Sequence, residues 1–133
     1  MMTKAPRRVL IVDDALIMRQ RIRDIAEAAG WQVAGEAADG HQAIAMYNQV
    51  QPDLVTMDIV MPGMDGVTAL KQLIQQDSQA KVVMISAVNQ KGKLAECIQN
   101  GAFDFVVKPF DKTSLRSFFK NQLANSPDGR KLR

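Results

Sequence analysis

Short apolar runs rich in β-branched residues recur at regular intervals along the chain. The five runs are residues 9–12, 33–37, 54–57, 82–85 and 105–107, and a polar residue directly follows each of them except 33–37. Continuous apolar runs of this length are typical of strands that are buried on both faces, as in a parallel sheet. The pattern therefore predicts five strands, and those at 9–12, 54–57 and 105–107 are expected to be buried.

The segments between these runs carry apolar residues at helical spacing. In the first segment, Gly30 is placed to end a helix whose apolar face comprises Ile22, Ile25, Ala26 and Ala29. In the second, Asp39 and Gln42 fit a capping box, and Pro52 cannot continue the helix that follows. The apolar face of this second helix is predicted to comprise Ala43, Met46, Tyr47 and Val50.

Three further helices are predicted in the remaining segments, over about residues 65–75, over 91–99 and from Asp111 onward. The inward-facing residues are predicted to be Val67, Leu70, Leu73 and Ile74 in the first of these helices and Leu115, Phe118 and Phe119 in the last. Regular alternation of strands and helices implies parallel strands joined by right-handed crossovers. The predicted fold class is therefore α/β, a single doubly wound five-stranded sheet with five helices on its two faces.

Composition is ordinary for one globular domain, because the 133 residues include 47% hydrophobic and 23% charged residues. No apolar run approaches the length of a membrane span, and no apolar segment of the signal-peptide type follows the N-terminal charges. The single cysteine, Cys97, cannot form an internal disulfide, which fits a reducing compartment. We therefore expect a cytoplasmic protein that does not associate with membranes.

The net charge of +3 comes from the two ends of the chain rather than from its centre. The basic residues at these ends are Lys4, Arg7, Arg8, Arg130, Lys131 and Arg133. We interpret residues 1–7 as a basic extension, residues 8–123 as the folded domain and residues 124–133 as a polar, basic tail. The sequence contains no basic helix with interleaved aromatic residues, so binding to nucleic acid is not expected.

Four charged residues stand directly after predicted strands. Asp13 and Asp14 follow the first strand, Asp58 follows the third and Lys108 follows the fifth. Ligands of open α/β sheets bind outside the carboxyl ends of the strands, so these residues are expected to converge on one pocket. Taken alone, Asp14 fits a helix N-cap. The acidic pair together with Asp58 favours a metal site instead.

Three carboxylates held close together need a counter-charge, because like charges raise one another's pKa. Mg²⁺ supplies that charge, and it commonly binds carboxylates together with phosphate oxygens. Zinc or copper is not expected, because His41 and Cys97 lie far from the acids and fit ordinary helix positions. Beside Mg²⁺, the Asp58 carboxylate is a competent nucleophile toward phosphorus, with Lys108 as the cation and Ser86 as a hydrogen-bond donor.

Four motifs carry a family resemblance: VDD at 12–14, DIVMPGMDG at 58–66, SA at 86–87 and KPF at 108–110. In this order and spacing they resemble the receiver domain of two-component response regulators, especially the stand-alone chemotaxis type, over roughly residues 7–123. The resemblance implies a flavodoxin-like sheet with strand order 2-1-3-4-5, an order for which the chemotaxis regulator is itself an example. It also implies a phosphorylation-dependent signalling switch, not an enzyme that turns over external substrates.

By this resemblance, Asp58 is the phosphoacceptor. Mg²⁺ is bound by Asp14, Asp58 and the backbone carbonyl of Val60, and Asp13 acts mostly through water. The phosphoryl donor is a sensor histidine kinase or a histidine phosphotransfer protein, and acetyl phosphate also serves as a donor.

The resemblance further implies that Ser86 and Lys108 hold phosphoryl oxygens and that the Lys108–Pro109 bond is cis. Phe105 matches the switch aromatic of the family, although a plain core position fits it equally well. On phosphorylation, Ser86 moves toward the phosphoryl group and the aromatic ring turns inward. The surface of the fourth helix, fifth strand and fifth helix then changes, and a target protein reads that surface.

The kinase and the target are not identified by the sequence. Exposed residues of the first helix, such as Arg19 and Arg23, are expected to determine which kinase is recognised. The protein is expected to be a monomer, or a dimer on phosphorylation.

Val60 and Val88 lie two residues after Asp58 and Ser86, at positions that tune phosphoryl hydrolysis in similar receivers. Polar side chains there can orient an attacking water molecule, whereas branched apolar side chains cannot form a hydrogen bond with it. We therefore expect slow self-dephosphorylation. Alternatively, the two valines merely cover the loop.

Three other functions share part of this pattern. The chain could be the receiver half of a longer response regulator, because its C-terminal tail resembles a linker. A phosphatase of the haloacid-dehalogenase type also uses an Asp nucleophile with Mg²⁺, but it carries a second acid where this chain has Ala15. A flavin-binding module needs a phosphate loop rich in Ser, Thr and Gly after the first strand, where this chain has two aspartates.

Overall fold

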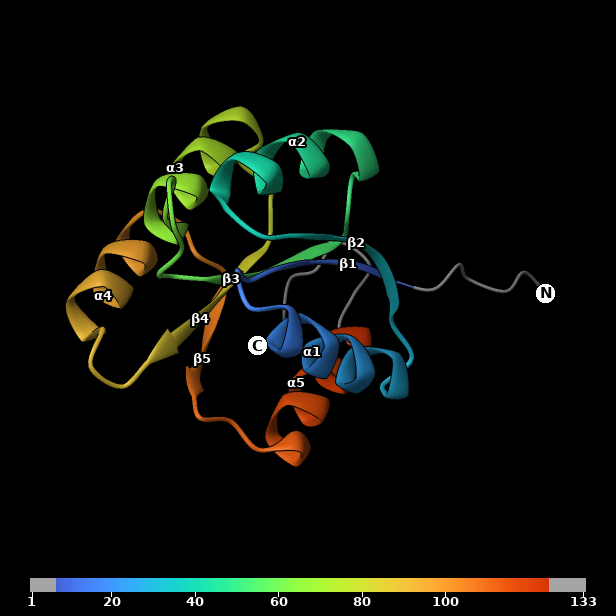
Figure 1. Cartoon of the computed structure of the whole chain (residues 1–133). Coiled ribbons are helices and arrows are strands. Elements are labelled where there is room, and N and C mark those ends of the chain that lie inside the picture. Colours follow the sequence, from blue (N-terminus) through green and yellow to red (C-terminus); the bar gives the residue numbers. More distant parts are fainter. Residues whose placement is uncertain (1–6, 125–133) are drawn as a thin grey trace.

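The computed structural model describes residues 7–124 and shows strands and helices in strict alternation (Figure 1). The elements are β1 (Arg8–Val12), α1 (Leu16–Ala28), β2 (Gln32–Ala37), α2 (Gly40–Val50), β3 (Leu54–Asp58), α3 (Gly66–Gln76), β4 (Val82–Ala87), α4 (Lys91–Gln99), β5 (Asp104–Lys108) and α5 (Lys112–Ala124). The predicted basic ends, 1–7 and 124–133, lie outside the described residues except for Arg7 and Ala124. Within the described part, no helix is long and apolar enough to cross a membrane.

The five strands run parallel in one sheet, in the order β2-β1-β3-β4-β5. Helices α2, α3 and α4 cover one face of the sheet, and α1 and α5 cover the other (Figure 1). This arrangement confirms the predicted α/β class, the doubly wound sheet and the strand order. Because β3 is central and β1 is its neighbour, the residues after these two strands emerge side by side at the carboxyl edge.

Each face of the sheet has its own apolar core. Leu10 and Met57 lie in the core under α2, α3 and α4. Ile11 lies in the core under α1 and α5, together with Trp31 and Phe119. The indole N–H of Trp31 donates to the backbone carbonyl of Phe119 at 2.9 Å, so the polar edge of this buried ring is satisfied.

The strands differ in burial according to their place in the sheet. All five residues of β3 are buried, as predicted for a strand that is covered on both faces. The same prediction is wrong for β5, where Phe105 is 41% exposed and Val107 is 38% exposed. The physical reason is position: β5 pairs with β4 and ends the sheet, so one face of its apolar run remains at the surface.

The ends of the helices follow the residues that predicted them. Gly30 lies just after α1 with a φ of +97°, a left-handed conformation that glycine adopts readily. Asp39 caps α2 by accepting from the backbone N–H of Gln42 at 2.9 Å. The Gln42 amide oxygen accepts from Ala38 instead of from Asp39, so the reciprocal bond of the predicted capping box is displaced by one residue.

Candidate functional site

The three predicted acids converge at the carboxyl edge of the sheet. Asp58 is the last residue of β3, and Asp13 and Asp14 directly follow β1, the neighbouring strand. Asp13 and Asp58 are buried, whereas Asp14 is exposed. One carboxylate oxygen from each of the three lies within 4.8 Å of the others. This set of hard oxygen donors therefore fits a small divalent cation such as Mg²⁺.

Lys108 brings a positive charge to the same edge from β5. Its Nζ lies 3.3 Å from Oδ2 of Asp13 and 3.4 Å from Oδ2 of Asp58, so the side chain reaches across β4 to both buried acids. The Lys108–Pro109 peptide bond is cis, as predicted. The predicted convergence of these four charged residues is confirmed by this geometry.

The charges in the cluster are unbalanced, because three carboxylates face one ammonium group. Burial raises the pKa of Asp58 above its ordinary value, the Lys108 ammonium opposes that rise, and Asp13 and Asp14 add to it. Two negative charges therefore remain without a partner among these residues. A divalent cation held by these carboxylates would supply the charge that balances them.

The two adjacent acids have different local roles. The Asp13 carboxylate accepts from the backbone N–H of Ala15 at 2.9 Å, and its backbone N–H donates to Ala37 on β2 at 3.1 Å. Ala15 itself occupies the N-cap of α1, and no side chain caps that helix. The alternative reading of Asp14 as a helix cap is therefore wrong. Its carboxylate makes no hydrogen bond or ion pair with the residues that the structure describes.

Ser86 and the predicted switch residue lie on β4 and β5. Ser86 is buried, and its hydroxyl donates to the backbone carbonyl of Ala87 at 2.9 Å. The alternative placement of Phe105 in the core is wrong, because this residue of the edge strand is 41% exposed and belongs to neither apolar core. The two predicted lifetime residues are also exposed, Val60 to 47% and Val88 to 63%.

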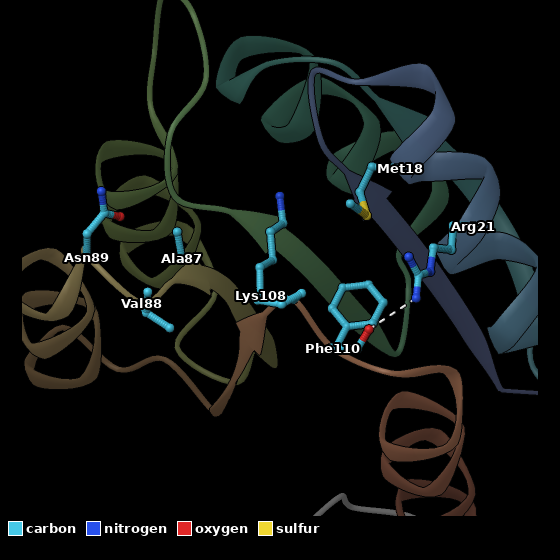
Figure 2. A pocket seen from close by; sticks show the side chains of 8 residues that line it. Met18, Arg21, Ala87, Val88, Asn89, Lys108 and Phe110 are labelled. Carbon is cyan, nitrogen blue, oxygen red and sulfur yellow. Dashed lines mark hydrogen bonds between the residues drawn. The ribbon is translucent and has the colours of Figure 1, made fainter.

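A cavity of about 520 Å³ opens beside Lys108, between α1 and the loops after β4 and β5 (Figure 2). Its lining is mostly apolar and comprises Met18, Arg21, Ala87, Val88, Asn89, Lys108, Pro109 and Phe110. Arg21 closes one side of the cavity. Its guanidinium donates to the backbone carbonyl of Phe110 at 3.1 Å and lies 5.1 Å from the centre of the Phe110 ring. The cavity therefore adjoins the charged cluster through Lys108.

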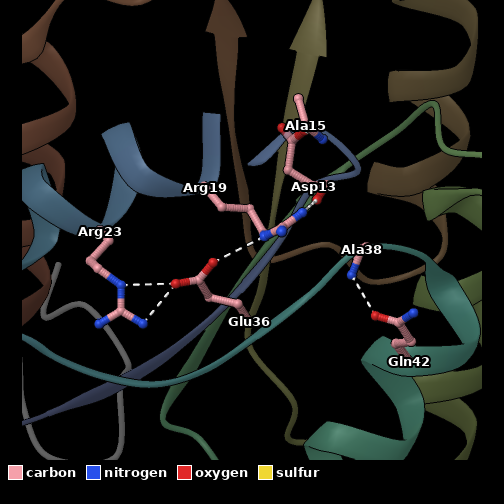
Figure 3. Close-up of polar contacts among 7 residues, drawn as sticks. All are labelled: Asp13, Ala15, Arg19, Arg23, Glu36, Ala38 and Gln42. Atoms are coloured by element: carbon pink, nitrogen blue, oxygen red, sulfur yellow. Dashed lines mark hydrogen bonds and ion pairs between the residues drawn. The ribbon is translucent and has the colours of Figure 1, made fainter. Parts of the chain in front are cut away.

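Two arginines of α1 differ from their predicted role as exposed recognition residues. The side chain of Arg19 is only 15% exposed, and both Arg19 and Arg23 bind Glu36 on β2, at 3.0 and 2.7 Å (Figure 3). Burial alone would raise the pKa of Glu36, but the hydrogen bonds from Arg23 and Arg19 outweigh it and hold the pKa below its usual value. The prediction that Arg19 and Arg23 are exposed is wrong, because both side chains form ion pairs with Glu36 on the edge strand β2.

Two further residues support the site and were not assigned to it from the sequence. Arg19 also donates to the backbone carbonyl of Asp13 at 2.7 Å (Figure 3). Gly66 begins α3 directly against the backbone of Asp58 and Ile59, where a Cβ atom would overlap the Asp58 carbonyl oxygen. The glycines of the DIVMPGMDG motif indicate a tight loop in the sequence, whereas no feature of the sequence indicates the hydrogen bond from Arg19 to the Asp13 carbonyl.

Comparisons with known proteins agree with this geometry. A profile of the response regulator receiver domain family matches residues 9–120. Chemotaxis protein CheY of Bacillus subtilis is 53% identical over 103 residues, which cover 77% of this chain and 86% of that protein. Protein CcdB of the same organism is 51% identical over 108 residues, which cover 81% of this chain and 90% of that protein.

Solved structures show the same relationship. A chain in the crystal structure of the CheX–CheY–BeF3–Mg²⁺ complex from Borrelia burgdorferi matches with a TM-score of 0.80 and 37% identity, over 85% of this chain and 87% of that chain. Sequence, fold and the position of the charged cluster thus lead to the same assignment. This chain belongs to the response regulator receiver domain family and is a CheY-like receiver domain.

Proposed function

We propose that this receiver domain is a phosphorylation-dependent signalling switch in which Asp58 accepts a phosphoryl group. One observation carries the proposal: the buried Asp58 carboxylate lies at the carboxyl edge of the central strand, 3.4 Å from the Lys108 ammonium and within 4.8 Å of two further acids. A nucleophile, a cation and a set of metal ligands therefore occupy one small volume. Phosphoryl transfer requires these three components in one place.

Asp14, Asp58 and the backbone carbonyl of Val60 would hold Mg²⁺, with Asp13 contributing mostly through water. The fit rests on the three converging carboxylates and on the two negative charges that Lys108 leaves unbalanced. When bound, Mg²⁺ neutralises charge on the carboxylates and on the phosphoryl oxygens.

In the proposed reaction, an Asp58 carboxylate oxygen attacks the phosphorus of a phosphohistidine or an acyl phosphate. The new P–O bond forms as the bond to the donor breaks, and the donor leaves as an imidazole that takes a proton from water or as a carboxylate. Lys108 stabilises the negative charge on the equatorial phosphoryl oxygens. Asp58 accepts one phosphoryl group per protein and loses it only by slow hydrolysis, so we propose a signalling protein and not an enzyme that turns over external substrates.

Two residues would transmit phosphorylation to the surface. The Ser86 hydroxyl, which now donates to Ala87, would release that carbonyl and turn to the phosphoryl group. Phe105 would then turn inward from its exposed position on β5.

The exposed apolar residues Phe105, Val107 and Ile98 support the proposal that a target protein binds across α4, β5 and α5.

The partners follow from the family. A sensor histidine kinase or a histidine phosphotransfer protein would donate the phosphoryl group, and the similarity to CheY proteins supports a place in chemotaxis signalling. We expect no direct role for nucleic acid. The protein would act as a monomer, or as a dimer on phosphorylation.

The phosphoryl group is expected to be long-lived. Val60 and Val88 are both exposed and apolar, so neither can orient a water molecule for attack on phosphorus. Replacing Val60 with Asn and Val88 with Glu should accelerate dephosphorylation, measured as the decay of phosphorylated protein after the donor is removed. An unchanged decay rate would mean that the two valines only cover the loop.

The function is tested by the intact mass of the protein after incubation with acetyl phosphate and Mg²⁺. We expect one added phosphoryl group, lost in EDTA and in Asp58→Asn. Asp24→Asn is the matched control, because Asp24 is an exposed acid on α1 away from the cluster, and this variant should still be phosphorylated. Absence of an adduct with any donor would contradict the proposal. Repeated turnover of a small phosphate ester would instead support a phosphatase.

A further inference from the structure

The position of the Asp14 carboxylate depends on the backbone that carries it. Asp14 is exposed, and its side chain makes no hydrogen bond or ion pair with the described residues. By contrast, the Asp13 carboxylate is held on both oxygens, by the N–H of Ala15 and by the ammonium of Lys108. Any preorganisation of Asp14 for a metal must therefore come from the main chain between Asp13 and Ala15.

Arg19 holds this stretch of main chain. Its Nη1 donates at 2.7 Å to the backbone carbonyl of Asp13, which belongs to the peptide unit that joins Asp13 to Asp14 (Figure 3). A short hydrogen bond from a charged donor fixes the orientation of that peptide plane. Arg19 lies at the end of the first turn of α1, so the helix holds the loop that precedes it.

The guanidinium of Arg19 is itself braced. Its Nε donates at 3.0 Å to Glu36 on β2, and Arg23 holds the other oxygen of the same carboxylate through Nε at 2.8 Å. Both arginines thus share one anchor, but the Asp13 carbonyl accepts a bond from Arg19 and not from Arg23 among the contacts of the described chain. The two side chains form a natural pair for comparison.

We propose that Arg19, braced by Glu36, is a positioning residue for the Mg²⁺ site. It holds the Asp13–Asp14 peptide in the orientation that presents the Asp14 carboxylate to the metal. This inference rests on the proposed function, because it assumes that Asp14 is a metal ligand. Arg19 touches neither the metal nor the phosphoryl group in this role.

Positioning and electrostatics predict opposite effects of removing Arg19. A positive charge near the acids repels Mg²⁺, so its removal should strengthen metal binding if charge alone mattered. Loss of the bond to the Asp13 carbonyl should weaken metal binding, because the loop must then be ordered when the metal binds. The sign of the change in Mg²⁺ affinity therefore distinguishes the two roles.

The experiment is calorimetric titration of MgCl2 into the wild-type protein, Arg19→Met and Arg23→Met. Both variants lose a cation and a bond to Glu36, but Arg19→Met also loses the bond to Asp13. Partners of metal-binding groups typically contribute about tenfold or more in metal affinity, so we expect Arg19→Met to bind Mg²⁺ about tenfold more weakly. Arg23→Met should bind Mg²⁺ as tightly as the wild type or slightly more tightly.

Two further readouts separate positioning from general damage to the fold. The initial rate of phosphorylation by acetyl phosphate should require more Mg²⁺ for half-saturation in Arg19→Met, while the rate at saturating Mg²⁺ stays near that of the wild type. Arg19→Lys, which can still donate to the Asp13 carbonyl, should recover part of the affinity. Urea unfolding in EDTA should be affected similarly in the two Met variants.

Two results would overturn the inference: unchanged or tighter Mg²⁺ binding by Arg19→Met, or an equal loss of affinity in Arg19→Met and Arg23→Met. These results leave the proposed function standing. Absence of Mg²⁺ binding by the wild-type protein would instead overturn the proposed function and this inference with it.

Discussion

Replacing Asp58 with Asn should stabilise the metal-free protein, even though Asp58 is central to the proposed function. The Asp58 carboxylate is buried with one cation 3.4 Å away and two acids within 4.8 Å. Burial raises its pKa, and the two acids raise it further against the pull of Lys108. A neutral amide of nearly the same shape removes both the burial of charge and the repulsion.

The magnitude follows from Coulomb's law. With an effective dielectric constant of about 20, the attraction at 3.4 Å is about 5 kcal/mol, and the two acids within 4.8 Å oppose it by a similar amount once solvent screens exposed Asp14. Attraction and repulsion therefore nearly cancel, and burial, the largest cause of the raised pKa of Asp58, decides the sign. Because the amide of Asn carries no charge to bury, we expect Asp58→Asn to raise the free energy of unfolding by about 1–2 kcal/mol.

The dependence on pH has a definite sign. A carboxyl group whose pKa is higher in the folded than in the unfolded protein destabilises the fold as pH rises from the ordinary value toward the raised one. Wild-type protein in EDTA should therefore lose stability over this interval relative to Asp58→Asn. The advantage of the variant should be fully developed once the pH exceeds the raised pKa of Asp58.

The assay is urea unfolding in EDTA and in MgCl2, with Asp24→Asn as the matched removal of an exposed carboxylate. Mg²⁺ should stabilise the wild-type protein more than Asp58→Asn, because binding to the folded state adds stability by mass action. The reasoning would be refuted if Asp58→Asn were less stable than the wild type in EDTA, or if Mg²⁺ stabilised both proteins equally.

Three further predictions concern stability and reactivity. Gly66→Ala should destabilise the protein by about 1–3 kcal/mol in urea unfolding, because the new methyl group overlaps the Asp58 carbonyl oxygen. Gly92→Ala, where the new methyl group has open space, should not destabilise it, and equal effects of the two substitutions would contradict this reasoning. Thr56→Val should raise the free energy of unfolding by about 1 kcal/mol, because the buried Thr56 hydroxyl has no hydrogen-bond partner in the described structure. A loss of stability would contradict this and would mean that the hydroxyl has a hydrogen-bond partner. Cys97 is buried, and burial raises the pKa of its thiol to about 11. It should therefore react with a maleimide only when urea unfolds the protein, and rapid labelling of the folded protein would contradict the burial of Cys97.

The convergence of the acids could be predicted from the sequence because parallel strands end at one edge of a sheet. Each of Asp13, Asp58 and Lys108 follows an apolar run, so the order of strands alone brings them together. The helix ends were also predictable, since Gly30 and Asp39 act through local backbone geometry.

Features that depend on tertiary contacts were not predictable in the same way. Arg19 binds a backbone carbonyl, and a backbone acceptor leaves no mark in the sequence. The exposure of Phe105 depends on the place of β5 at the edge of the sheet, which an apolar run does not reveal. Likewise, the hydrogen bond of Ser86 to Ala87 reflects one rotamer of a small hydroxyl side chain.

The central claim is that Asp58 is the residue that receives the phosphoryl group. Borohydride reduction converts a phosphorylated aspartate to homoserine, so peptide mass spectrometry after treatment with acetyl phosphate and Mg²⁺ locates the acceptor directly. The account predicts conversion at position 58, and none in EDTA. Conversion at Asp13 or Asp14, or at no residue under any donor, would contradict it.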